Sequence, residues 1–171
     1  QNRLNKYNIT LIKGDNKTIY KEENSKALLV YLNDSEQKLK IFDDLLAKLD
    51  VFNEILNNRR LTFKKIEIDR ENGFRAVGEK KKEKPLIDLS SGEQHEVVLF
   101  YELLFRVEQN SLVMIDEPEL SLHVAWQKEF LNDITRIAKI KKITVILATH
   151  SPQIISDQWD HVYDLMEHLN A

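Results

Sequence analysis

The sequence predicts an α/β fold in which parallel core strands are flanked by helices, with a helical arm and β-hairpins in front. Residues 111–115 and 143–147 are mostly apolar runs with the length of buried parallel strands. A helical pattern at 122–139 lies between them, with Val124, Phe130, Leu131, Ile134 and Ile137 as its expected inner face. A chain of 171 residues, 42% hydrophobic and 31% charged, is long enough for one domain with a real core.

Composition narrows the classes of function. The chain has no cysteine, which excludes disulfides and thiolate metal sites and fits a cytoplasmic setting. No apolar run approaches the roughly 20 residues that cross a bilayer, and no signal peptide is visible, so no membrane partner is expected. The net charge of −3 argues against a generally basic nucleic-acid surface, while a local basic patch stays open.

The N-terminal part is expected to contain a hairpin and an arm-like helix. At 8–20, apolar and polar residues alternate around the turn Gly14-Asp15-Asn16. From 35 to 58, apolar residues spaced alternately by three and four form one helical stripe: Phe42, Leu45, Leu49, Phe52 and Leu56. Asp34 is the expected N-cap, with Gln37 as its capping-box partner. An ordinary amphipathic helix packed on its own domain is favoured over a true coiled-coil arm.

The next two segments, Leu61–Asp69 and Phe74–Gly78, are predicted to pair as strands through the turn at 70–73. The apolar residues of the first strand fall in two opposite phases, and a β-bulge at Lys64-Lys65 would turn both toward the core. The basic run 80–84 is predicted to be a solvated loop rather than a DNA or phosphate contact, because no aromatic residues interrupt it.

A candidate anion site precedes the first core strand. Ser90, Ser91 and Gly92 lie at a predicted helix N-terminus, where free N–H groups and the helix dipole favour a phosphate. The serine hydroxyls add donors, and Gly92 permits close approach. An ordinary serine N-cap, with Glu93 and Gln94 in the first turn, fits the same residues equally well.

The first core strand ends at two adjacent carboxylates, Asp116 and Glu117, before Pro118 stops it. Ligands of parallel sheets bind beyond the carboxyl ends of the strands, so these acids are expected to meet one. Asp116 can hold a hard cation such as Mg²⁺ while Glu117, on the other side of the strand, takes a proton from water. The alternative is a strand that runs into an acidic surface turn.

Taken together, these segments resemble the C-terminal half of an ABC-type P-loop ATPase domain, and are most similar to the SMC/RecF-like AAA-family ATPases of bacteria. The resemblance covers about residues 61–165. Its motifs occur in the family's order: signature motif 89–94, Walker B strand 111–117, D-loop 119–123 and switch histidine His150. Four motifs in order are far more specific than any one of them.

The resemblance implies ATP and Mg²⁺ as ligands and a homodimer closed around ATP. It implies Glu117 and His150 as catalytic residues and Asp116 as the metal ligand. The nucleotide-binding residues that it implies are Ser90, Ser91, Gly92, Glu93, Ser121 and His123. The signature residues would contact ATP bound to the opposite protomer. His123 stands where transporters have aspartate, so the cross-dimer role of the D-loop stays open between Ser121 and His123.

The loop that would hold the α- and β-phosphates is absent from the sequence. The four glycines, at 14, 73, 78 and 92, cannot form G-x-x-x-x-G-K-[ST], and Gly14–Thr18 lacks the required glycines. We therefore expect the C-terminal portion of a longer ATPase, which also fits a first residue that is not Met. Residues 1–60 would be the hairpin and arm, residues 61–171 the C-terminal lobe, and the Walker A lobe would be missing. Such a chain should bind ATP weakly or not at all and expose an apolar patch or self-associate.

The expected function is ATP hydrolysis coupled to dimerisation, with an output in DNA repair or in defence, where DNA or an associated nuclease would be the partner. The competing class is a non-catalytic interaction scaffold derived from an ATPase. A transporter subunit is disfavoured by the SSGEQ form of the signature and by His123. His95, His161 and His168 form no metal-ligand pattern and are left without a role.

Overall fold

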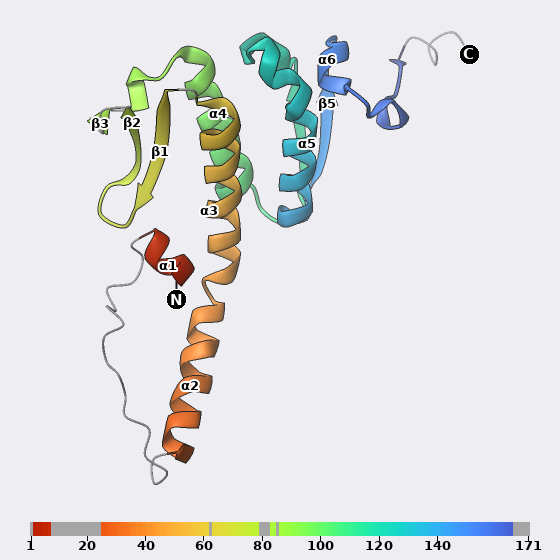
Figure 1. Ribbon diagram of the computed structural model, residues 1–171. Helices are drawn as coiled ribbons and strands as arrows, with labels where there is room; N and C mark the ends of the chain where they lie inside the picture. The colour runs from red at the N-terminus through yellow and green to blue at the C-terminus, as the bar shows by residue number, and fades with distance from the viewer. Residues whose placement is uncertain (1, 8–24, 62, 79–82, 85, 166–171) are drawn as a thin grey trace.

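The computed structural model describes residues 2–7, 25–61, 63–78, 83–84 and 86–165. It has an α/β fold with two sheets, a three-stranded antiparallel sheet (β1–β3) and a two-stranded parallel sheet (β4–β5), with helices between them (Figure 1). A long helical arm projects away from both sheets. The hairpin predicted at 8–20 lies outside the described residues.

The arm consists of α2 (Ser25–Lys40), α3 (Asp43–Ile55) and the π-helical turn η2 (Leu56–Arg60). The helix predicted from residue 35 therefore begins at Ser25 and breaks before α3. Asp34 is not its N-cap: it lies inside α2, where its carboxylate accepts a hydrogen bond from Lys38 Nζ at 2.6 Å. Charge pairs four residues apart stabilise a helix even where its apolar side chains are not buried. The apolar spacing therefore predicted the later turns of the arm but not its first turns.

The predicted stripe is confirmed in its C-terminal half, where Leu49, Phe52 and Leu56 are buried. Leu45 is the exception: it is 37% exposed, whereas its neighbour Leu46 is buried. Leu46 packs with Leu4 and Tyr7 at the short helix α1 (Asn2–Lys6), which covers this side of α3 (Figure 1). Packing against α1 therefore buries Leu46, where the spacing predicted Leu45.

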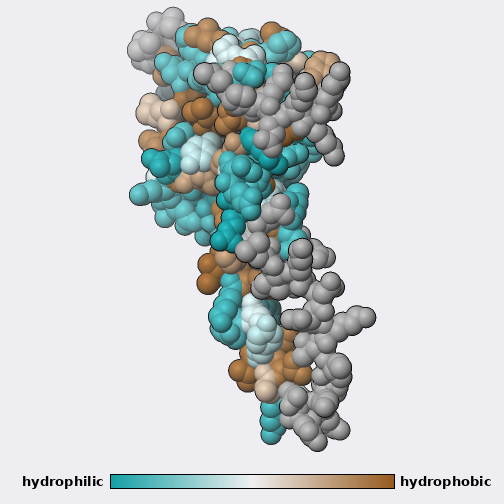
Figure 2. All heavy atoms as spheres, turned by 90° about the vertical axis from the view of Figure 1, so that its left-hand side faces the viewer, coloured by the Kyte–Doolittle hydropathy of each residue, from teal (hydrophilic) through white to brown (hydrophobic). Residues whose placement is uncertain are grey.

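Beyond α1, the arm carries exposed apolar side chains. No residue of α2 is buried, and Leu29, Val30, Tyr31 and Leu32 are each more than 60% exposed. Hydrophobic surface on this part of the arm is visible in Figure 2. Exposed ion pairs four residues apart, Asp34–Lys38 and Glu36–Lys40, are among the contacts that support this helix.

The antiparallel sheet is built from β1 (Lys64–Asp69), β2 (Gly73–Gly78) and β3 (Glu83–Lys84). The predicted pairing of the first two strands is confirmed, but the predicted bulge is wrong. The register runs unbroken from Lys64 opposite Gly78 to Asp69 opposite Gly73. Phe63, which suggested the second phase, lies before β1 and is 69% exposed. Residues 80–82 of the basic run lie outside the described part of the chain.

The remaining elements alternate between helices and the two parallel strands. In order they are η3 (Leu86–Asp88), α4 (Ser91–Tyr101), η4 (Glu102–Arg106), β4 (Leu112–Asp116), η5 (Pro118–Ser121), α5 (Val124–Lys141), β5 (Thr144–Ala148), α6 (Pro152–Ile155) and η6 (Trp159–His161). Both core strands lie within one residue of their predicted bounds. They pair in parallel, with Asp116 opposite Ala148.

The core lies on one face of the parallel sheet. Residues such as Ile115 and Leu147 pack against the core, and α5 contributes the buried side chains Phe130, Ile134 and Ile137. Val124, predicted on this inner face, is 58% exposed because it is the first residue of α5, at the helix end.

The other face of the parallel sheet is open. Leu112, Met114 and Ile146 are 58%, 75% and 49% exposed. The prediction of fully buried strands is therefore half right, and the expected exposed apolar patch lies here. Within the described ranges, no helix combines the length and apolarity that crossing a bilayer requires.

Candidate functional site

The acid pair terminates β4 in a strained turn. Glu117 N donates to Ala148 O at 2.8 Å, which extends the pairing of the two parallel strands by one step. Glu117 itself has φ of 44°, in the left-handed region, and Pro118 opens η5 immediately after it. A residue with a Cβ adopts this conformation at a cost of roughly 1–2 kcal/mol, and such strain concentrates at functional sites.

His150 follows the end of β5 at the same edge of the sheet. Its Nε2 lies 3.8 Å from Glu117 Oε1. Both side chains face solvent, His150 with 90% and Glu117 with 44% of its side chain exposed. Asp116 is exposed as well, on the open face of β4. The structure therefore brings Asp116, Glu117 and His150 to one edge, as the carboxyl ends of adjacent parallel strands require.

A third acid, Glu119, ties the two loops at this edge together. Its Oε2 accepts a hydrogen bond from Thr149 Oγ1 and its Oε1 accepts one from His150 N, both at 2.7 Å. Partial burial alone would raise the pKa of the Glu119 carboxyl, but these hydrogen bonds outweigh burial and lower it. Sequence reasoning placed Glu119 in the D-loop without giving it a role. The one signal available was a third carboxylate directly after the Glu-Pro step.

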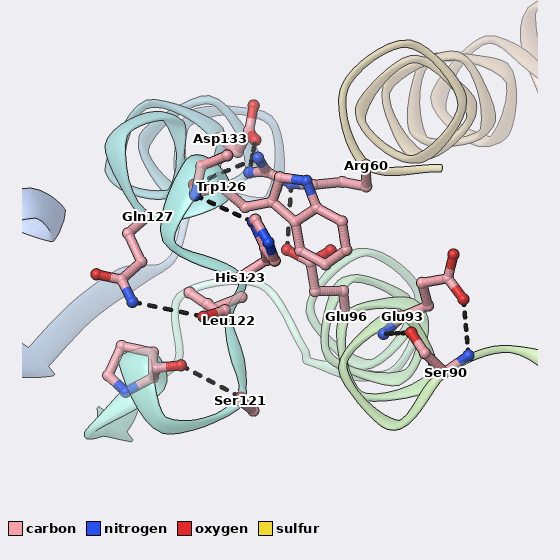
Figure 3. Close-up of polar contacts among 12 residues, drawn as sticks. Arg60, Ser90, Glu93, Glu96, Ser121, Leu122, His123, Trp126, Gln127 and Asp133 are labelled. Carbon is pink, nitrogen blue, oxygen red and sulfur yellow. Dashed lines mark hydrogen bonds and ion pairs between the residues drawn. The ribbon is translucent and has the colours of Figure 1, made fainter. Parts of the chain in front are cut away.

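Gln127 of α5 forms hydrogen bonds with both loops at this edge of the sheet. Its Nε2 donates to the carbonyl oxygen of Leu122 at 3.4 Å (Figure 3). The same Nε2 donates to the carbonyl oxygen of Glu119 at 3.5 Å. Its Oε1 accepts from Ser151 Oγ at 2.8 Å. This amide is buried and links the turn after β4 to the loop after β5.

The predicted anion site is at the start of α4. Ser90 caps the helix: its Oγ accepts from Glu93 N at 3.3 Å, and Glu93 Oε2 accepts from Ser90 N at 2.7 Å (Figure 3). Lys64 Nζ lies 2.7 Å from Glu93 Oε2. Burial alone would raise the pKa of Glu93, but Lys64 and Ser90 outweigh it and lower the pKa. Ser90 and Glu93 thus form a capping box, the N-cap arrangement that the sequence offered as the alternative.

The turn that contains Gly92 also packs closely on the turn that contains Ser121. A Cβ placed on Gly92 would lie 3.1 Å from Ser121 O, so glycine allows this approach. Ser91 is exposed beside it. The two motifs, about 30 residues apart in the chain, are neighbours in the fold.

Both D-loop candidates make local contacts. Ser121 Oγ donates to Pro118 O at 3.2 Å, and His123 Nδ1 accepts from Ala125 N at 3.3 Å as the N-cap of α5. The His123 ring lies 5.6 Å from the Trp126 ring (Figure 3). Trp126 is partly buried, and its ring atom Cζ3 lies 4.0 Å from the position of a Cβ built on Gly92.

A buried charge cluster that the sequence did not reveal lies behind these motifs. Arg60, at the end of the arm, forms an ion pair with Asp133 of α5 and places its Nε 3.1 Å from Glu96 Oε1 of α4 (Figure 3). Its Nη1 also donates to Trp126 O at 3.3 Å. All three charged side chains are 1% exposed or less. The cluster therefore joins the arm to α4 and α5.

The pKa of the Glu96 carboxyl is raised well above its usual value. Burial raises it most; Arg60 opposes the shift and Asp133 adds to it, and the result is a pKa of about 7 instead of 4.5. Among the described residues, none donates a well-aligned hydrogen bond to either Glu96 carboxylate oxygen. One guanidinium is thus shared by two carboxyls, and a proton on Glu96 relieves their repulsion.

This shift predicts a pH-dependent stability. Between pH 4.5 and 7 the folded chain holds a proton on Glu96 that the unfolded chain releases, so stability is present at low pH and lost as pH rises through 7. We expect the unfolding free energy to fall by roughly 2–3 kcal/mol more in the wild type than in Glu96→Gln between pH 5 and 8. Urea denaturation of both proteins at each pH measures this difference, and parallel pH profiles would contradict it.

The acid pair suits one kind of metal site. Among the residues that the structure places, no three or more histidine, aspartate or glutamate side chains cluster as a metal cage. Mg²⁺ is commonly held by one or two carboxylates together with substrate phosphates, and exposed Asp116 at the strand end fits that mode.

Comparison with known proteins identifies relatives over most of the chain. The sequence profile of the family described as "AAA domain, putative AbiEii toxin, Type IV TA system" matches residues 4–156. Protein ea59 of Escherichia phage lambda is 36% identical over 77 residues, which are 44% of this chain and 14% of that protein. The zinc import ATP-binding protein ZnuC of Rickettsia bellii is 31% identical over 133 residues, 78% of this chain and 54% of that relative.

A further relative is the thiamine import ATP-binding protein ThiQ of Photobacterium profundum, 39% identical over 64 residues, which are 37% of this chain and 25% of that protein. The matches thus span between 14% and 54% of the relatives' own length.

Proposed function

The chain belongs to this AAA-domain family, and from that premise we propose that it forms the C-terminal part of an ATP-hydrolysing, ABC-type ATPase of the SMC/RecF-like kind. The observation that carries the proposal is the single sheet edge that holds Asp116, Glu117 and His150, with Nε2 of His150 3.8 Å from Glu117 Oε1. The names of the ZnuC and ThiQ relatives, both ATP-binding proteins, support ATP as the nucleotide.

Each residue at this edge has a proposed role. Glu117 polarises the attacking water and takes its proton, which its exposed carboxylate is placed to do. Asp116 holds Mg²⁺, and the metal neutralises phosphate charge when it is bound. His150 contacts the γ-phosphate and helps to place the water, because it reaches solvent beside Glu117.

The signature residues are proposed to act on a second copy of the protein. Ser90, Ser91, Gly92 and Glu93 surround the N-terminus of α4, where backbone N–H groups and the helix dipole favour a phosphate. We place the γ-phosphate of the opposite protomer there, with exposed His123 and the adjacent Ser121 at the dimer contact. Ser90 would exchange its capping contact for the phosphate or share its hydroxyl between them.

The biological output is proposed to be cytoplasmic defence, with DNA repair as the second possibility and DNA or an associated nuclease as partner. The family's description, which names a "putative AbiEii toxin" and a type IV TA system, supports defence. The competing function is a scaffold that binds a partner without ATP turnover. Hydrolysis of ATP by the full-length protein separates the two, because a scaffold would show none.

A mixing experiment tests the dimer. Ser90→Asp keeps a good N-cap but places a negative charge against the phosphate, while Ser90→Asn is the matched neutral control. We expect Ser90→Asp and Glu117→Gln to be inactive alone in the full-length protein. Mixed in equal amounts they should recover about a quarter of wild-type single-turnover hydrolysis, since half the dimers would contain one intact site of two.

The outcomes of that mixture are decisive in either direction. Recovery requires that Ser90 and Glu117 of one site come from different protomers. A mixture no more active than its components would overturn the shared site. Absence of hydrolysis in the wild-type full-length protein would overturn the ATPase proposal itself and leave the scaffold.

A further inference from the structure

We propose that Glu119 is a positioning residue that fixes the loop of His150 against Glu117. The inference rests on the ATPase function proposed above, and it gives Glu119 a role distinct from Asp116 and Glu117. Both carboxylate oxygens of Glu119 accept hydrogen bonds from the loop after β5. It acts through the backbone of His150.

The geometry of the Glu119 carboxylate supports this role. Its two oxygens accept from two consecutive residues of the loop after β5, Thr149 Oγ1 and His150 N, each at 2.7 Å. Ser151 N in turn donates to Thr149 Oγ1 at 3.0 Å. The Glu119 side chain, on the turn after β4, is therefore hydrogen-bonded to the loop after β5 at Thr149 and His150.

The exposure of His150 explains why the loop that carries it needs the hydrogen bonds to Glu119. With 90% of its side chain exposed, little packing orients the imidazole, so its position depends on the backbone that carries it. A loop free to shift by about 1 Å would lose up to roughly 100-fold in rate at a catalytic group. Hydrogen bonds to a charged acceptor are the stronger kind and suit the purpose.

Gln127 completes the connection. It accepts from Ser151 Oγ at 2.8 Å and donates to the Glu119 carbonyl at 3.5 Å. The backbone of Glu119 and the loop 149–151 are thus attached to the same buried amide of α5. Glu119 positions the histidine relative to the acid pair through a closed set of hydrogen bonds rather than through one contact.

Two substitutions distinguish the hydrogen bonds of Glu119 from its negative charge. Glu119→Ala removes both acceptors, so we expect kcat of the full-length protein to fall about 10- to 100-fold with KM for ATP little changed. Glu119→Gln keeps one acceptor for His150 N, and its amide can donate to the Thr149 hydroxyl, which also accepts. Glu119→Gln should therefore retain most of the rate. Glu108→Ala, at an exposed position, is the control for general effects.

A double-mutant cycle with His150→Ala decides whether Glu119 acts through the histidine. In the His150→Ala background, Glu119→Ala should lower kcat by no more than about twofold, since the group it positions is gone. Losses that multiply in the double variant would overturn the proposal, as would a Glu119→Ala protein with wild-type kcat.

Amide hydrogen exchange gives a readout that does not depend on turnover. Glu119→Ala should speed exchange at His150 N by at least about tenfold, while Glu119→Gln leaves it near the wild-type rate. Unchanged exchange in Glu119→Ala would overturn the positioning role even where ATP hydrolysis is confirmed. A wild-type protein without hydrolysis would instead overturn the ATPase function, and with it the catalytic meaning of the contact.

Discussion

Full-length protein that carries Glu117→Gln should bind ATP as the wild type does but hydrolyse it at least about 100-fold more slowly. Glutamine keeps the size and hydrogen-bonding capacity of the side chain but cannot take a proton. The left-handed turn at Glu117 and its bond to Ala148 O involve only the backbone, so the substitution leaves the edge of the sheet in place. Steady-state turnover and an equilibrium nucleotide-binding measurement together give the result.

The matched control for this substitution is Glu108→Gln. Glu108 is exposed, precedes β4 and lies away from the strand end, so this change should leave turnover within about twofold of wild type. Turnover of Glu117→Gln equal to that of Glu108→Gln would exclude Glu117 as the general base. Loss of ATP binding in Glu117→Gln would instead assign the residue to holding the nucleotide.

The gathering of Glu117 and His150 could be predicted because topology leaves little choice. Two apolar strands joined through a helix pair in parallel, and the residues after each strand then meet at one edge. The sequence located both strand ends to within one residue. The contact of Glu119 with the loop after β5 was beyond the sequence, because it depends on how the turn at Pro118 aims one side chain.

Residue spacing led to wrong predictions where a tertiary contact determines which of two neighbouring residues is buried. Leu46 is buried in place of Leu45 because α1 packs on that side of the arm, and no spacing rule contains that contact. The bulge was expected because Phe63 was counted as part of β1, whereas it lies before the strand. The cluster around Arg60 carried no sequence signal, since its members come from three separate elements.

Replacing Arg60 with methionine should lower the unfolding free energy of this chain by about 3–5 kcal/mol at pH 8. Methionine fills much of the volume but removes the guanidinium that pairs with Glu96 and Asp133, and both carboxyl side chains are 1% exposed or less. Urea denaturation followed by circular dichroism measures the loss. Arg136→Met is the matched control: its ion pair with Glu54, at 2.8 Å, is 40% and 39% exposed, and its interaction with Asp133 is weaker than that with Glu54, so it should contribute at most about 1 kcal/mol.

Removing the Glu96 and Asp133 carboxylates as well tests whether their charges cause the loss of stability in Arg60→Met. Adding Glu96→Met and Asp133→Leu to Arg60→Met should recover most of the stability, because an apolar cluster of similar volume has no charge to desolvate. The defect of Arg60→Met alone should also be smaller at pH 5 than at pH 8, since Glu96, with a pKa of about 7, is then protonated and one buried charge instead of two loses its contact with Arg60. A defect of Arg60→Met no larger than that of Arg136→Met, or one that persists unchanged in the apolar triple variant, would show that packing rather than charge joins the arm to α4 and α5.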